Sequence, residues 1–170
     1  MAILYQAHRS EMGTGDVLEF CSHSMLGRLI RWKTGKDVNH TALIIEADFL
    51  GDKRLMLLEA LGAGIAPNFL SNRITDFDGE IYWLKLQKEW GSRKIDIMRE
   101  ALKYVGTPYD YGSIFKQLFR RVSVDFNKLF CSEFGYNVLQ KVGIAPLLPT
   151  APYPGEMCDL GCFENRIRIL

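Results

Sequence analysis

The sequence predicts a single α+β domain over residues 1–170, in which an antiparallel sheet packs against a few helices. Short apolar runs separated by turn residues occupy the first half of the chain and are typical of strands. Apolar residues at helical spacing occupy much of the second half. No repeat or linker divides the chain, and 170 residues can bury a core without the help of metals or disulfides.

The first two elements expected are a strand and a helix. Residues 15–20 alternate after a turn signal, which indicates a strand. Residues 24–33 carry apolar side chains at helical spacing, and Gly35 suits the end of that helix.

Three further strands are expected in the first half. Residues 41–45 form a short apolar run, which is the mark of a buried strand. After a turn at residues 51–53, residues 55–60 return as a second strand, so that the two can pair as a hairpin. Residues 80–86 provide another strand.

The next elements expected are two helices. Ser92 is a suitable N-cap for the first, whose apolar stripe comprises Ile95, Met98, Ala101, Leu102 and Val105. Residues 106–108 end this helix, because glycine and proline do not continue it. A second, less regular helix is expected over residues 113–121.

A third helix and a closing strand complete the prediction. The helix begins near Cys131 and ends before Gly143, with an apolar face of Phe134, Gly135, Val138, Leu139 and Val142. Residues 146–154 are rich in proline and irregular, and residues 166–169 form the closing strand.

Composition excludes several classes of function. Lysine and arginine number 21 against 20 aspartates and glutamates, so no overall field attracts nucleic acid. The N-terminus lacks a basic start followed by a long apolar stretch, and no run approaches the roughly 18 apolar residues of a spanning helix. A chain of this length does not need its four cysteines as disulfides. We therefore expect a reduced, soluble, cytoplasmic protein without a cofactor.

Cys131 is the candidate nucleophile. It stands where the third helix begins, within Phe130-Cys131-Ser132-Glu133. Unpaired backbone N–H groups and the positive end of the helix dipole favour the thiolate at such a position. A nucleophilic thiol also needs a base that holds it deprotonated, and a third group that orients this base.

His40 is the candidate base, and Glu59 is its candidate orienting partner. His40 alone among the three histidines directly precedes an apolar strand, where its ring can be fixed while it faces a cleft. In a hairpin, the two residues share a face only if Ala42, rather than Thr41, lies opposite Glu59. They are then diagonal neighbours within reach of a hydrogen bond. Glu46 has the parity of His40 but lies about 20 Å along an extended strand.

Each of these residues also has a structural interpretation. Cys131 falls on the apolar stripe of its helix, and free cysteines are usually inert core residues. His40 could be a hydrogen-bonded histidine at a strand end, and Glu59 an ordinary carboxylate at the rim. The conjunction of a thiol, a histidine and an acid at these positions favours catalysis.

Two other groups of residues have less specific patterns. Cys158 and Cys162, with Cys21 and His23, supply zinc-ligand types, but the C-x-x-x-C spacing is loose and we expect no metal site. The basic helix over residues 24–33 could lie on a membrane, although a packed amphipathic helix is the commoner use of such a pattern.

Six short motifs occur in a shared order along the chain. They are Gly15-Asp16-Val17-Leu18, the serine-bearing helix from Ser24, Asn39-His40-Thr41-Ala42-Leu43-Ile44, Leu58-Glu59-Ala60 followed by Gly64-Ile65, Gly106-Thr107-Pro108-Tyr109-Asp110 and Phe130-Cys131-Ser132-Glu133. In this order the chain resembles the permuted papain-like cysteine peptidases of the NlpC type, in particular the YiiX/YebB-like branch. The resemblance extends from about residue 15 to about residue 143.

The resemblance implies a circularly permuted papain-like fold, in which the histidine strand precedes the cysteine helix. By matching motif, Cys131 would be the nucleophile, His40 the general base and acid, and Glu59 its orienting partner. Tyr109 and Asp16 are candidate substrate-binding residues, although Tyr109 could instead fill the core. Family members resemble amidases that cut bacterial cell-wall stem peptides, and relatives on the same permuted fold include lecithin retinol acyltransferase-like enzymes.

We therefore predict a cysteine peptidase or amidase that acts on a peptide or acyl substrate through an acyl-enzyme. The same triad would serve a lipid acyl hydrolase or acyltransferase, with the Trp32 helix in contact with a membrane. A non-catalytic binding module on the same fold is the third hypothesis, and an intact Cys131, His40 and Glu59 set argues against it. The sequence does not predict an oligomeric state.

Overall fold

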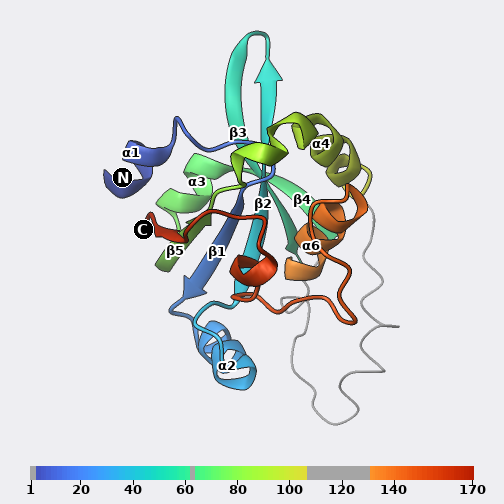
Figure 1. The fold of residues 1–170 in the computed structure, drawn as a ribbon. Helices are drawn as coiled ribbons and strands as arrows, with labels where there is room; N and C mark the ends of the chain where they lie inside the picture. Colours follow the sequence, from blue (N-terminus) through green and yellow to red (C-terminus); the bar gives the residue numbers. More distant parts are fainter. Residues whose placement is uncertain (1–2, 62–63, 107–130) are drawn as a thin grey trace.

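The fold is built on a six-stranded sheet in which every neighbouring pair of strands is antiparallel (Figure 1). The computed structural model describes residues 3–61, 64–106 and 131–170. The strand order is β4-β3-β2-β1-β5-β6. The strands are β1 (Val17–Ser22), β2 (His40–Phe49), β3 (Asp52–Leu61), β4 (Gly64–Phe69), β5 (Gly79–Leu84) and β6 (Ile167–Arg168). The predicted α+β class is confirmed.

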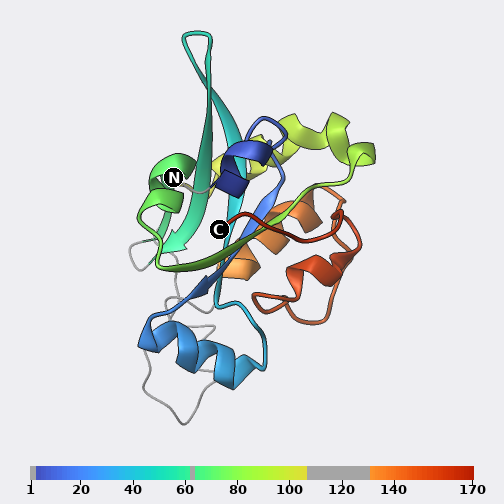
Figure 2. The same ribbon diagram turned by 90° about the vertical axis from the view of Figure 1, so that its left-hand side faces the viewer.

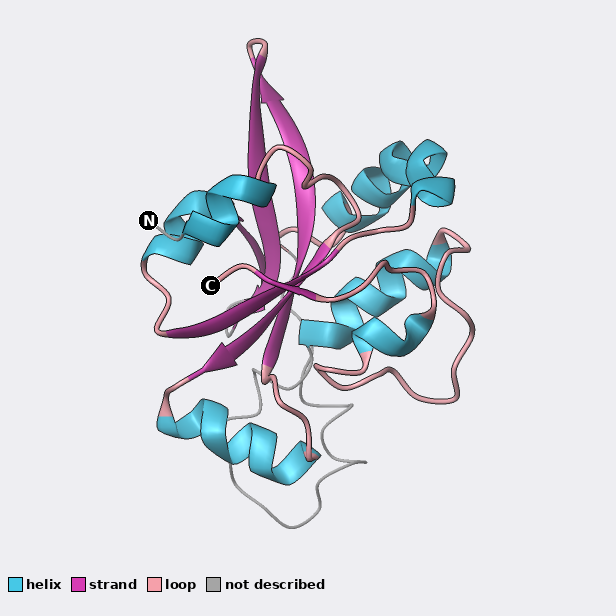
Figure 3. Ribbon diagram, turned by 60° about the vertical axis from the view of Figure 1, so that its left-hand side comes forward, coloured by secondary structure: helices cyan, strands magenta, loops and turns pink. Residues whose placement is uncertain are grey.

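Helices cover both faces of the sheet (Figures 1 and 3). The α-helices are α1 (Ile3–His8), α2 (Met25–Thr34), α3 (Leu70–Thr75), α4 (Lys94–Leu102) and α6 (Cys131–Lys141), and the 3₁₀ turns are η1 (Lys88–Arg93) and η3 (Met157–Leu160). Helices α4 and α6 lie on one face and α1 and α3 on the other. Helix α2 lies beyond one end of the sheet, and the tip of the β2–β3 hairpin extends beyond the opposite end (Figure 2).

Two apolar cores follow from the alternation of side chains along the strands. Even-numbered residues of β1 and β2, among them Phe20 and Ile44, pack against α1 and α3. Odd-numbered residues of the same strands, such as Val17 and Leu43, pack against α4 and α6. Among the described residues, no helix is long and apolar enough to cross a membrane.

The predicted strands and two of the predicted helices are confirmed. In α2, the N-cap hydroxyl Oγ of Ser24 accepts a hydrogen bond from the N–H of Gly27 at 3.1 Å, and Gly35 ends the helix with φ of 67°. Helix α6 begins at Cys131 and buries the face that the sequence predicts. The helix expected over residues 113–121 lies outside the described residues.

The start and the buried face of α4 differ from the prediction. The predicted N-cap, Ser92, lies in the 3₁₀ turn η1 instead, and the helix begins only at Lys94. Ile95 is 57% exposed, whereas Ile97 is fully buried. The predicted stripe is therefore right at Ala101, which is fully buried, and wrong at Ile95 and Leu102, which are exposed, because Ile97 packs in the core instead.

Three short elements have no counterpart in the prediction. Helices α1 and α3 have six residues each, too few for a helical pattern to be recognised. Strand β4 contains Pro67, which argues against a strand in the middle of a sheet. The proline is tolerated here because β4 is the edge strand of the sheet.

The sheet divides at one end of the central strands. Strand β2 stays paired with β1 as far as His40, and β3 stays paired with β4 as far as Leu61. The ladder between β2 and β3, however, runs only from the Phe49–Asp52 pair to the Leu43–Leu58 pair. The last residues of this ladder therefore border a gap between the two strands, and Cys131 lies at this gap, as its contact with Thr41 shows.

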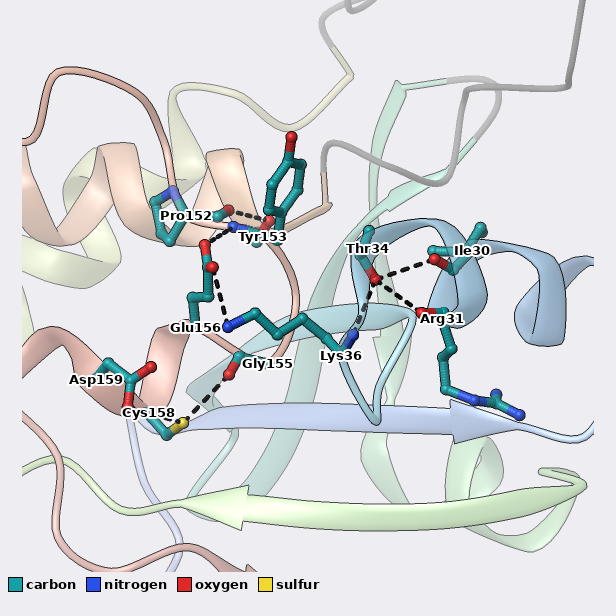
Figure 4. A network of polar contacts seen from close by, with 11 residues as sticks. Ile30, Arg31, Thr34, Lys36, Pro152, Tyr153, Gly155, Glu156, Cys158 and Asp159 are labelled. Atoms are coloured by element: carbon teal, nitrogen blue, oxygen red, sulfur yellow. Dashed lines mark hydrogen bonds and ion pairs between the residues drawn. The ribbon is translucent and has the colours of Figure 1, made fainter. Parts of the chain in front are cut away.

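The C-terminal tail fixes the start of α6. The hydroxyl of Ser132 donates a hydrogen bond to the carbonyl of Pro152 at 2.7 Å. A few residues later, Glu156 pairs with Lys36 at 3.0 Å and accepts a hydrogen bond from the N–H of Tyr153 (Figure 4). The tail thus links the end of α2 to the residue beside Cys131.

A buried ion pair joins the tail to β1. Glu19 is fully buried, and its Oε2 lies 3.0 Å from Nε of Arg166. Arg166 also donates to Asp37 at 2.6 Å. Burial raises the pKa of Glu19 to about 7, because the nearby Arg166 charge offsets only part of the lost hydration.

Candidate active site

Helix α6 positions the thiol of Cys131. Phe134, Val138 and Leu139 are buried in the core between α6 and the sheet, which fixes the helix with its first residue at the gap between β2 and β3. Cys131 itself is 1% exposed. The backbone N–H of Thr41, on β2, donates a hydrogen bond to Sγ of Cys131 at 3.1 Å. A donor aimed at the sulfur favours its charged form.

The hairpin register brings His40 and Glu59 together. The ladder pairs Leu43 with Leu58, so one step further the same register sets Ala42 opposite Glu59. This is the register that the sequence required for the two side chains to share a face. Nε2 of His40 lies 2.9 Å from Oε2 of Glu59, as expected for diagonal neighbours.

Two further residues hold the carboxylate of Glu59. Arg73, on α3, donates from Nε to Oε2 at 3.1 Å, and Asn68, on β4, donates from Nδ2 to Oε1 at 3.1 Å. Glu59 is fully buried, so these donors replace its lost hydration. Sequence reasoning missed both residues, because β4 and α3 are among the elements that it did not predict.

The imidazole of His40 lies between the carboxylate and the thiol. Nε2 faces Glu59, and the ring is also a hydrogen-bond partner of Cys131. The ring packs against Phe20 with the two ring centroids 5.4 Å apart. A histidine held on three sides in this way keeps one orientation, which is what a general base requires.

The three groups shift one another's pKa values. Burial alone lowers the pKa of His40, but the neighbouring Cys131 and Glu59 raise it to about 9. Burial raises the pKa of Glu59, but His40, Arg73 and Asn68 together lower it to about 2. Burial likewise raises the pKa of Cys131, and His40 and the Thr41 N–H outweigh that effect, so the pKa falls below its ordinary value. The site favours a thiolate beside an imidazolium.

The structure describes only one of the two candidate substrate-binding residues, Asp16. Asp16 is buried, and its carboxylate accepts hydrogen bonds at 2.9 Å from the backbone N–H of Gly13, the indole of Trp83 and the N–H of Leu86. These contacts hold the turn before β1 against the end of β5, and a role in substrate binding stays a prediction. Tyr109 lies outside the described residues.

The zinc-ligand types noted in the sequence do not gather into a site. All four cysteines are free thiols. Cys158 donates a hydrogen bond to the carbonyl of Gly155 (Figure 4), and His23 pairs with Asp78 at 3.1 Å. Within residues 3–61, 64–106 and 131–170, no three His, Cys, Asp or Glu side chains are grouped so as to hold a metal ion.

Comparison with solved structures supports the fold. The structure is similar to the crystal structure of the metalloprotein yiiX from Escherichia coli O157:H7, with a TM-score of 0.57 and 21% sequence identity over 79% of this chain and 69% of that chain. No family model matches the sequence, and no curated protein matches it. At this identity the similarity extends to the fold alone.

The metal implied by the name of that neighbour has no evident place among the described residues. The donors nearest to a ligand set are Cys131, His40 and Glu59, and these already bind one another or their protein neighbours. Glu59 in particular accepts from His40, Arg73 and Asn68, which occupy three of the roughly four acceptor sites of its carboxylate.

Proposed function

We propose that the chain is a cysteine peptidase or amidase on a circularly permuted papain-like fold. The observation that carries the proposal is a connected line of thiol, imidazole and carboxylate, contributed by α6, β2 and β3. Glu59 orients His40, and the resulting positive imidazole lowers the pKa of Cys131. A core cysteine without a catalytic role needs none of these partners.

The proposed reaction passes through an acyl-enzyme. The thiolate of Cys131 attacks the carbonyl carbon of an amide, and the backbone N–H of Cys131 helps to hold the oxyanion. The C–N bond then breaks as His40 transfers its proton to the leaving amine. A water molecule, deprotonated by the now neutral His40, attacks the thioester. This step releases the carboxylic acid and restores the thiolate.

Selective alkylation tests the nucleophile. With iodoacetamide near pH 7 and peptide-level mass spectrometry, Cys131 should react first, because the other three thiols have raised pKa values, to about 11 for Cys158 and Cys162. The variant His40→Ala should slow the labelling of Cys131 alone. Equal, slow labelling of all four cysteines, or labelling of Cys131 unchanged by His40→Ala, contradicts the proposal.

A substrate screen tests the reaction itself. The protein and its Cys131→Ser variant are incubated with peptidoglycan fragments and with acyl lipids, and mass spectrometry follows released products and adducts at residue 131. Peptide fragments cut by the protein and left intact by Cys131→Ser support an amidase. Products formed only from lipids support an acyl hydrolase or acyltransferase instead.

An exposed apolar face on α2 favours this second candidate, a lipid-directed enzyme. Met25, Leu29 and Trp32 recur at helical spacing and are 89%, 42% and 81% exposed. Arg28 is exposed beside them, as in helices that lie on anionic membranes. The assay is binding to anionic liposomes. Loss of binding in Trp32→Ser supports the lipid-directed enzyme, provided that Ile95→Ser still binds. Ile95→Ser is the control, because it removes an exposed apolar side chain from α4. Indifference of the protein to such liposomes rejects the lipid-directed enzyme.

A further inference from the structure

A cavity of about 290 Å³ adjoins the proposed catalytic histidine. Its walls include His40 and Asn39 at the start of β2, Ser22 at the end of β1, Ser24 at the start of α2, and Arg73 and Phe77. Of the described catalytic candidates, His40 lines this cavity and Cys131 does not. The cavity therefore gives a second molecule access to the imidazole.

Arg73 is held rigidly at the wall of this cavity. Its Nε donates to Glu59, and its guanidinium packs over the rings of Phe20 and Phe77 at 5.0 and 5.1 Å from their centroids. The side chain remains 30% exposed. A guanidinium has five N–H donors in a planar fork that matches a carboxylate, and stacking of this kind fixes the fork before a ligand arrives.

The charges around the cavity favour an anion. Arg31 lies behind its polar wall and donates from Nη1 to the carbonyl of Ser22 and to Oδ1 of Asn39. The carboxylate of Glu59 is engaged by His40, Arg73 and Asn68. The remaining acid, Asp78, has a side chain that is 87% exposed and pairs with His23, so water screens its charge.

We propose that this cavity is the leaving-group subsite of the hydrolase, and that it takes an amine whose own carboxylate binds Arg73. The inference rests on the proposed function, since it assumes that His40 protonates the leaving group. In that step the departing nitrogen lies beside His40, and the rest of the leaving group occupies the cavity. The favoured substrate is thus a short peptide cut next to its carboxyl-terminal residue. This residue leaves as a free amino acid, which has both an amine to receive the proton of His40 and a carboxylate to bind Arg73.

Two alkylating agents that differ only in charge test the subsite. The rate constants of Cys131 with iodoacetate and with iodoacetamide are measured at the same pH, and their ratio is compared between variants. Arg73 also binds Glu59, so its replacement could change the fraction of Cys131 present as thiolate. Both reagents attack the same thiolate, so such a change cancels in the ratio. Arg73→Gln should lower the ratio at least fivefold, as expected for loss of one nearby charge in a partly buried site. Arg73→Lys should retain most of it.

A matched control removes a positive charge elsewhere. Arg54→Gln does so in β3 near the tip of the hairpin, where Arg54 pairs only with Asp52 among the contacts described. It should leave the ratio unchanged. If Cys131 still labels rapidly and Arg73→Gln leaves the ratio unchanged, the subsite proposal is overturned. Slow labelling of Cys131 by both reagents overturns the proposed function instead, so the two failures are distinguishable.

Protection against iodoacetamide identifies the anion. Alanine, at millimolar concentration, should slow the labelling of Cys131 in the protein and not in Arg73→Gln. Alaninamide, which lacks the carboxylate, should protect at least fivefold less well. Protection by glycerol 3-phosphate and not by alanine overturns the carboxylate assignment and points to a phosphate-bearing leaving group. Absence of protection by either compound overturns the subsite.

Discussion

Replacing Glu59 by glutamine should lower the pH at which the imidazolium beside Cys131 loses its proton. Glutamine keeps the size of the side chain but removes the charge 2.9 Å from Nε2 of His40. The pKa of His40 should fall, because an imidazolium without a carboxylate partner is disfavoured. At acid pH His40 stays protonated in both proteins, so the midpoint at which Cys131 becomes a thiolate should change little.

The size of this effect follows from the pKa of His40. That pKa stands at about 9 against an ordinary 6.5, because Cys131 and Glu59 together outweigh the effect of burial. A hydrogen bond to a charged group contributes about 1.5 kcal/mol, which corresponds to about one pKa unit. The alkaline midpoint of the pair should therefore fall by about one pH unit.

The assay is the alkylation rate of Cys131 with iodoacetate between pH 4 and pH 10, because this anionic reagent reacts fastest while the thiolate lies beside an imidazolium. In Glu59→Gln the rate on the alkaline arm should fall by up to about tenfold at a given pH. The midpoints belong to the coupled pair, so each is compared between variants rather than assigned to one residue. Glu46→Gln is the control, since Glu46 lies further along β2 and pairs with Lys53. An alkaline midpoint that Glu59→Gln leaves within about 0.3 unit of the parent protein refutes this reasoning.

Two further predictions concern the buried acids outside the triad. The folded-state pKa of Glu19 is raised from 4.5 to about 7, so its contribution to stability is present below about pH 4.5 and is lost as the pH rises through about 7. Glu19→Gln should therefore match the parent protein in urea unfolding at pH 4.5 and exceed it by up to about 3 kcal/mol at pH 8; equal stability at both values contradicts this. Asp16→Ala leaves three buried N–H donors unpaired and should cost about 2 kcal/mol or more in the same assay, with the labelling of Cys131 unchanged. Slower substrate turnover without loss of stability would instead assign Asp16 to substrate binding.

The sequence predicts Cys131, His40 and Glu59 as candidate residues but not the contact between His40 and Glu59. Whether His40 and Glu59 share a face depends on the hairpin loop. The loop consists of Leu50 and Gly51, with φ of 58° and 90°, and Phe49 and Asp52 close it. A loop longer by one residue would turn Glu59 to the opposite face. Leucine is an unusual residue for a position with positive φ, so the sequence lacks the usual signal for this turn.

The partners of Glu59 lie beyond sequence reasoning for a different reason. Asn68 lies on a strand that contains a proline, and Arg73 lies on a helix of six residues without a side-chain N-cap bond. Neither element has a local signal strong enough to be predicted, because the proline argues against β4 and because α3 depends on the tertiary packing of Leu70 and Ile74. A buried glutamate requires donors, since an isolated carboxylate is too costly to bury. Their identity required the fold.

The divided sheet explains how two faces share one reaction. His40 and Glu59 have the parity of the core against α1 and α3, whereas Cys131 belongs to the core against α4 and α6. A continuous β2–β3 ladder would separate the thiol from the imidazole. Because the ladder stops at the Leu43–Leu58 pair, the N–H of Thr41 is available to the sulfur rather than to β3. The cavity is lined by His40 and Arg73, so the alkylation ratio and the pH profile both test the surroundings of the same imidazole.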